Sequence, residues 1–215
     1  MSKLLTEFIG TFFLVLTIGL VVVGETPMAP LAIGSGLMAM VYMGGHISGA
    51  HYNPAVSLAI ALRGKMSGSD LIAYWVVQMA GAIVAALAVR TITGEGFAAA
   101  PGAGATTIGA LLVEVLFTLA LALVVLQVAT SPKTEGNSYY GLAIGFTVTS
   151  GTWAGGAISG GAFNPAVGVG PILVEAFSGS GSLVNLWLYV IGPLLGGCIA
   201  ALVYKLQGDP DPLEA

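Results

Sequence analysis

Apolar residues run along this chain in long stretches that are separated by short segments rich in Gly, Pro, Ser and charged residues. The first stretch is unbroken from residue 8 to residue 23 and lacks the alternation of a transmembrane β-strand. A membrane-spanning helix needs roughly 20 mostly apolar residues. The pattern therefore predicts an all-α membrane protein with six transmembrane helices. The predicted spans are residues 4–23, 31–45, 70–90, 107–129, 139–153 and 183–206.

Two other apolar stretches are interrupted by Gly, Ser and Pro. They cover residues 45–62 and 155–174, and each is too broken to cross a bilayer as one helix. Irregular backbone is tolerated at membrane depth only where it is buried or lines a water-filled cavity. Both stretches are therefore predicted to be re-entrant segments, each with a half-helix.

The two re-entrant segments belong to an internal repeat. Glu7 recurs as Glu114 at an offset of 107 residues, and Asn53 recurs as Asn164 at an offset of 111. Three spans in each half would make the second half enter the membrane from the opposite side. We expect one domain over residues 1–215, with an inverted repeat whose halves cover about 1–104 and 105–215.

Charge and composition strengthen this interpretation. Only 7% of the residues are charged, against about 25% in soluble domains, and the mean hydropathy is +0.95. If both termini are cytoplasmic, five of the six basic residues lie inside and only Arg90 lies outside, as the positive-inside rule favours. We expect a multi-pass protein of the plasma membrane and no nucleic-acid partner, because the net charge of −4 comes from few groups.

Each repeat carries the tripeptide Asn-Pro-Ala in its re-entrant segment. Asn is a strong N-cap and Pro is favoured at the first helical position, so each tripeptide predicts the start of a half-helix. The capping oxygen would leave each Asn amide NH₂ free to face a lumen, and two helix N-termini would repel cations there. The tripeptides are Asn53, Pro54, Ala55 and Asn164, Pro165, Ala166.

The residues before each half-helix are expected to present backbone carbonyls along a pore. Uncharged solutes can exchange their hydrogen bonds with such acceptors, which predicts a small and neutral cargo. The carbonyls belong to Gly49, Ala50, His51, Gly160, Gly161 and Ala162.

With these motifs the chain resembles the aquaporin, or major intrinsic protein, family. The likeness extends over nearly the whole length, including residues 7–12, 45–56, 114–118 and 159–166. It implies six spans, two half-helices, a pore in each protomer and a homotetramer in the lipid bilayer. Its expected partners are water and small neutral solutes, carried down their gradients.

One position departs from the family pattern. Most members carry Arg after the second Asn-Pro-Ala, at a narrow outer constriction, whereas this chain has Val167. The family's usual spacings place the other constriction residues at Ile33, Thr152 and Gly161. None of the four is charged or aromatic. We therefore expect a wider, more apolar selectivity filter that passes water together with solutes such as glycerol, urea, ammonia or undissociated acids.

Two carboxylates lie inside predicted spans, where such groups are costly. Glu7 and Glu114 are interpreted as buried acceptors that support the re-entrant loops, as the resemblance also implies; a proton relay is the alternative. His46 and His51 are candidate pH sensors because imidazole titrates near neutrality, but buried and hydrogen-bonded imidazoles explain them equally well.

Other function classes have less support. The sequence has no nucleophile elbow, phosphate-binding loop or metal-ligand cluster and a single Cys, so we expect neither an enzyme nor a bound cofactor or metal. A water-selective aquaporin is the first alternative to a channel for several solutes. An inverted-repeat secondary transporter is the second, although it would need a coupling-ion site. A junction protein with a residual pore would need longer interacting tails.

Overall fold

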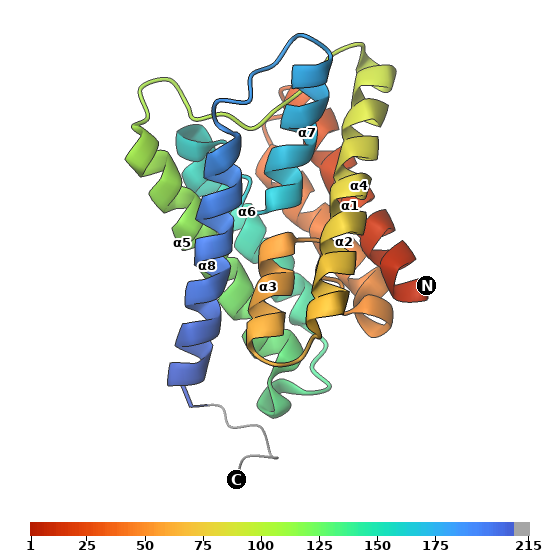
Figure 1. Ribbon diagram of the computed structural model, residues 1–215, viewed down its shortest axis with the longest axis vertical. Coiled ribbons are helices and arrows are strands. Elements are labelled where there is room, and N and C mark those ends of the chain that lie inside the picture. The colour runs from red at the N-terminus through yellow and green to blue at the C-terminus, as the bar shows by residue number, and fades with distance from the viewer. Residues whose placement is uncertain (209–215) are drawn as a thin grey trace.

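The computed structural model describes residues 1–208, and in this range the chain is helical (Figure 1). Five helices are long and apolar enough to cross a membrane, by length and composition. The elements are α1 (Ser2–Val23), α2 (Ala29–Ser48), α3 (Pro54–Leu62), α4 (Gly68–Thr93), α5 (Thr107–Val125), α6 (Tyr140–Ser159), α7 (Pro165–Phe177) and α8 (Leu186–Leu206). A π-helical turn, η1 (Leu126–Thr130), continues α5, and a 3₁₀ turn, η2 (Pro132–Thr134), follows it.

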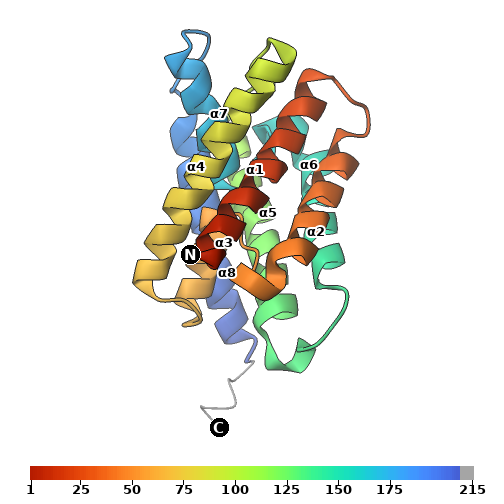
Figure 2. The same ribbon diagram turned by 90° about the vertical axis from the view of Figure 1, so that its right-hand side faces the viewer.

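The two short helices lie between the long ones. Figure 1 shows α3 in the lower half of the bundle and α7 in the upper half, with their N-terminal ends toward the middle. Seen from the side, α4 and α1 stand together, while α2 pairs with α6 (Figure 2). The helices thus surround a central region that both short helices reach from opposite ends.

The predicted re-entrant segments begin too early. The spans before the segments at 45–62 and 155–174 were predicted to end at residues 45 and 153, but α2 continues to Ser48 and α6 to Ser159. The glycines there serve close packing: a Cβ atom on Gly45 would lie 3.2 Å from Tyr140 Cε2, and one on Gly155 would lie 2.6 Å from Val113 Cγ1. Each helix instead ends at the following glycine, where Gly49 and Gly160 have φ angles of 87° and 91°.

The two halves meet where α2 and α6 cross. A Cβ atom on Gly34 would lie 2.5 Å from the carbonyl oxygen of Gly145, and one on Gly145 would lie 2.5 Å from the carbonyl oxygen of Gly34. Only glycine allows this approach. The two residues are 111 positions apart, which is the offset between the two Asn residues. Each half therefore contributes a glycine from the equivalent position of the repeat to the crossing. The crossing therefore lies on the pseudo-two-fold axis of the molecule.

Candidate functional site

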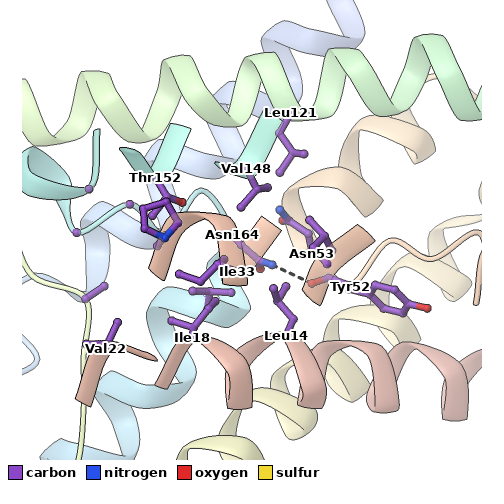
Figure 3. A pocket seen from close by; sticks show the side chains of 18 of the residues that line it. Leu14, Ile18, Val22, Ile33, Tyr52, Asn53, Leu121, Val148, Thr152 and Asn164 are labelled. Atoms are coloured by element: carbon purple, nitrogen blue, oxygen red, sulfur yellow. Dashed lines mark hydrogen bonds between the residues drawn. The ribbon is translucent and has the colours of Figure 1, made fainter. Parts of the chain in front are cut away.

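The N-terminal ends of α3 and α7 face each other at the centre of the bundle. Asn53 Oδ1 accepts hydrogen bonds from the first turn of α3, and Asn164 Oδ1 accepts one from the first turn of α7. Each amide also reaches into the other half. Asn53 Nδ2 donates to Phe163 O at 2.9 Å. Asn164 Nδ2 donates to Tyr52 O at 2.8 Å, the dashed line in Figure 3. These two hydrogen bonds therefore connect the loop before α3 to the loop before α7.

These cross-links correct the expectation that the Asn amide groups are free. The carbonyls of Tyr52 and Phe163 lie in non-helical backbone and need a donor when buried. One N–H of each amide supplies that donor, so each amide keeps one further N–H for other partners.

The loop before α3 is organised by a buried carboxylate. Glu7 is fully buried, and its two oxygens accept hydrogen bonds from Ser48 Oγ at 2.6 Å, His51 N at 3.0 Å, Tyr52 N at 2.8 Å and Gln78 Nε2 at 2.8 Å. These donors satisfy a carboxylate that would otherwise be costly in a membrane.

The second half repeats this arrangement. Glu114, also fully buried, accepts hydrogen bonds from Ser159 Oγ at 2.7 Å, Ala162 N at 3.0 Å and Phe163 N at 2.7 Å. Tyr52 and Phe163 both have φ angles of 48°, a backbone conformation that residues other than glycine rarely adopt. The loop backbone is therefore held in an unusual shape in which neighbouring N–H groups turn toward one carboxylate.

A cavity of about 370 Å³ lies beside the two Asn side chains. Figure 3 shows aliphatic side chains lining it, with Leu14 and Ile18 from α1 on one side and Leu121 and Val148 on another. All four positions expected to form the filter line this cavity: Ile33, Thr152, Gly161 and Val167. Thr152 Oγ1 is buried and has no hydrogen-bond partner among the described residues.

Most of the expected carbonyl-bearing residues line the same cavity. They are Ala50, His51, Gly160, Gly161 and Ala162. Gly49 lines a second cavity instead, of about 680 Å³, together with Val41, His46 and Lys65. Ile144 lines both cavities. The two spaces therefore adjoin at Ile144.

The two histidines lie in different surroundings. His51 Nδ1 lies 3.0 Å from Ser57 Oγ, so this buried imidazole has a polar partner on α3. His46 lines the second cavity near Lys65 and the segment that follows α5.

Sequence reasoning missed the loop between α4 and α5. Phe97 is buried, and the residues from Phe97 to Ala100 line the first cavity. A Cβ atom on Gly160 would lie 2.9 Å from Ala100 O, so this loop packs directly on the segment before α7. An uncharged run of Ala, Gly and Pro between two spans was the only available signal.

The basic residue expected outside the membrane has a partner. Arg90 Nη1 lies 3.1 Å from each carboxylate oxygen of Glu175, near the end of α7, and Ser180 Oγ donates to the same carboxylate at 2.8 Å. The pair joins α4 to the half-helix. Among residues 1–208, no group of three His, Cys, Asp or Glu side chains is arranged to hold a metal ion.

Two short helices whose N-terminal ends meet beside an apolar cavity, within a bundle of long apolar helices, are the arrangement expected of a membrane channel. Comparison with known proteins identifies the class more closely, since a sequence model of the major intrinsic protein family matches residues 1–204. Aquaporin NIP1-1 from Zea mays is 37% identical over 215 residues, covering 95% of this chain and 74% of that protein. Glycerol uptake facilitator protein-like 6 from Lactiplantibacillus plantarum is 35% identical, covering 98% of this chain and 100% of that protein.

A solved structure shares the fold. The aquaglyceroporin from Plasmodium falciparum superposes with a TM-score of 0.84 at 22% identity, covering 95% of both chains. The chain therefore belongs to the major intrinsic protein family. It is a multi-pass integral membrane protein of a channel family that is not enzymatic in general, with a channel for water and small solutes.

Proposed function

We propose that this protein is a passive channel for water and small uncharged solutes such as glycerol, urea or ammonia, with a wide filter that lacks Arg. The observation that carries the proposal is the uncharged lining of the cavity at Ile33, Thr152, Gly161 and Val167. Without a cationic side chain at this ring, larger neutral molecules meet aliphatic groups and one free hydroxyl.

The chemistry of passage follows from the groups beside the cavity. A neutral solute exchanges its water hydrogen bonds for those of the loop carbonyls, the Asn amides and Thr152 Oγ1. Cations are disfavoured because the N-terminal ends of α3 and α7 each carry roughly half a positive charge. Glu7 and Glu114 act in this proposal as supports of the loops rather than as a proton relay, because every oxygen of both carboxylates accepts at least one hydrogen bond.

The proposed membrane arrangement has six spans and two half-helices in a single domain. Support comes from the five apolar helices of spanning length together with α6, which is as long as α2, at 20 residues. The proposal places both termini in the cytoplasm and the protein in the plasma membrane, on the distribution of the basic residues. It also includes a homotetramer, as the family resemblance implies.

Stopped-flow light scattering on proteoliposomes tests the proposal. Vesicles given a glycerol gradient should shrink fast as water leaves and then swell fast as glycerol enters, and a sucrose gradient should give the shrinkage alone. Empty vesicles provide the background rates. Fast shrinkage with only background re-swelling, for glycerol and equally for urea and ammonia, would mean a water-selective channel and would refute the wide filter.

A further inference from the structure

The repeat gives the outer filter a counterpart on the inner side of the Asn pair. The offset of 111 relates Ile33 to Ile144, Thr152 to Val41, Gly161 to Ala50 and Val167 to Val56. Because residues with this offset meet at the Gly34–Gly145 crossing, related residues lie at matching distances on opposite sides of the pseudo-two-fold axis. We call Val41, Ala50, Val56 and Ile144 the inner quartet.

The cavities place this quartet where two spaces adjoin. Ala50 and Val56 line the cavity beside the Asn pair, Val41 lines the second cavity, and Ile144 lines both. All four are buried and belong to one hydrophobic cluster. The two cavities therefore meet at Ile144, and the other three residues of the quartet line one cavity or the other.

We call the expected filter residues Ile33, Thr152, Gly161 and Val167 the outer quartet, and the two quartets differ in polarity. The outer quartet has Thr152, whose hydroxyl has no protein partner in the described part of the chain, whereas the related inner residue is Val41. The inner quartet has no polar side-chain atom at all. A hydrogen-bonding solute loses partners in such a ring, and a narrow ring of aliphatic groups also excludes water by dewetting.

We propose that the inner quartet is a second, apolar filter and the larger barrier to strongly hydrated solutes. This inference rests on the proposed function and specifies its solutes. Glycerol and urea, which make several hydrogen bonds, meet their main resistance at Ile144, Val41 and Val56, and ammonia and other weakly hydrated neutral molecules pass this ring more easily. The absence of Arg at the outer quartet therefore does not by itself set the solute range.

Three substitutions on the inner side and one on the outer side test this filter. Ile144→Ala widens the inner ring, and Ile33→Ala is the matched control because the repeat relates the two positions. Val41→Thr and Val56→Thr add a hydroxyl with almost no change of shape. Size-exclusion chromatography and the quantity of reconstituted protein establish that each variant is folded, and water, glycerol and ammonia permeabilities are measured by stopped flow.

The expected results separate the two rings. Ile144→Ala should raise glycerol permeability about tenfold, because a wider inner ring lets glycerol keep about one more hydrogen bond to water, and Ile33→Ala, which widens the outer filter, should raise it by a clearly smaller factor. Val41→Thr and Val56→Thr should raise the permeabilities of water and glycerol more than that of ammonia. If Ile144→Ala does not fold, the two Thr variants decide the question alone.

The contrary results are distinct. The inner filter is refuted if the inner variants leave every permeability within twofold of the unsubstituted protein, or if Ile33→Ala has the larger effect. The unsubstituted protein still conducts in those cases, and the proposed function stands. Background rates for all solutes in the unsubstituted protein would instead refute the proposed function, and the inner filter with it.

Discussion

Replacing Glu7 by Gln tests how the re-entrant loop is held. The carboxylate is fully buried and accepts hydrogen bonds from two backbone N–H groups, Ser48 Oγ and Gln78 Nε2. Gln supplies one acceptor oxygen in place of two. Its NH₂ group would take the place of the second oxygen, where it would face groups that are themselves donors. The substitution keeps the size of the side chain and removes its charge, so packing is preserved.

The magnitude follows from counting the donors that lose an acceptor. Gln78 Oε1 has no partner among the described residues, so the side chain of Gln78 can turn and accept from the new amide. One backbone N–H, that of His51 or Tyr52, is then left unpaired. A buried unpaired donor costs about 1–3 kcal/mol, so Glu7→Gln should lower the free energy of unfolding by this amount. Glu7→Ala leaves both N–H groups unpaired and should cost roughly twice as much.

Thermal unfolding in detergent, followed by tryptophan fluorescence, measures the order of stabilities. We expect the unsubstituted protein to unfold at the highest temperature, Glu7→Gln lower and Glu7→Ala lowest, with Glu114→Gln close to Glu7→Gln because Glu114 accepts the same pair of backbone bonds. Glu7→Gln should retain water flux in proteoliposomes. The reasoning fails if Glu7→Ala is as stable as the unsubstituted protein, or if Glu7→Gln keeps its stability and loses all flux, as a proton relay would require.

Four further substitutions have defined outcomes. Thr152→Val should leave the unfolding temperature unchanged or slightly higher, because the hydroxyl has no protein partner, and should lower glycerol permeability by severalfold in stopped flow; unchanged glycerol flux would mean that the hydroxyl does not contact the solute. Val167→Arg should reduce glycerol permeability more than water permeability in the same assay, and equal reductions would contradict a filter at this position. Arg90→Met should destabilise the protein by about 1–3 kcal/mol in thermal unfolding, because it leaves the largely buried Glu175 carboxylate without its cation. Glu175→Gln should cost less than Arg90→Met, since Arg90 is the more exposed partner, and the opposite order would refute this assignment.

Several features could be predicted because local rules determine them. The starts of α3 and α7 follow from Asn and Pro, whose capping geometry depends on neighbouring residues only. The helical content follows from the low charge of the chain, since a backbone in lipid must satisfy its own hydrogen bonds. The equivalence of Glu7 and Glu114 follows from the repeat.

Other features depend on partners that are far away in the sequence. Local propensity cannot distinguish a glycine that ends a helix from one that allows two helices to touch, which is why the ends of α2 and α6 were placed too early. The role of the loop from Phe97 to Ala100 was invisible for the same reason.

Composition, capping and spacing are properties of the chain, so they were enough to predict the class of protein, the two half-helix starts and the uncharged residues at the expected filter positions. Three features became visible only in the folded chain: each Asn amide binds the carbonyl of the opposite loop, Arg90 pairs with Glu175 85 residues away, and Ile144 lies where two cavities adjoin. The physical reason is that these interactions require distant segments to pack at atomic contact. No short stretch of sequence specifies which partner a donor or a side chain will meet.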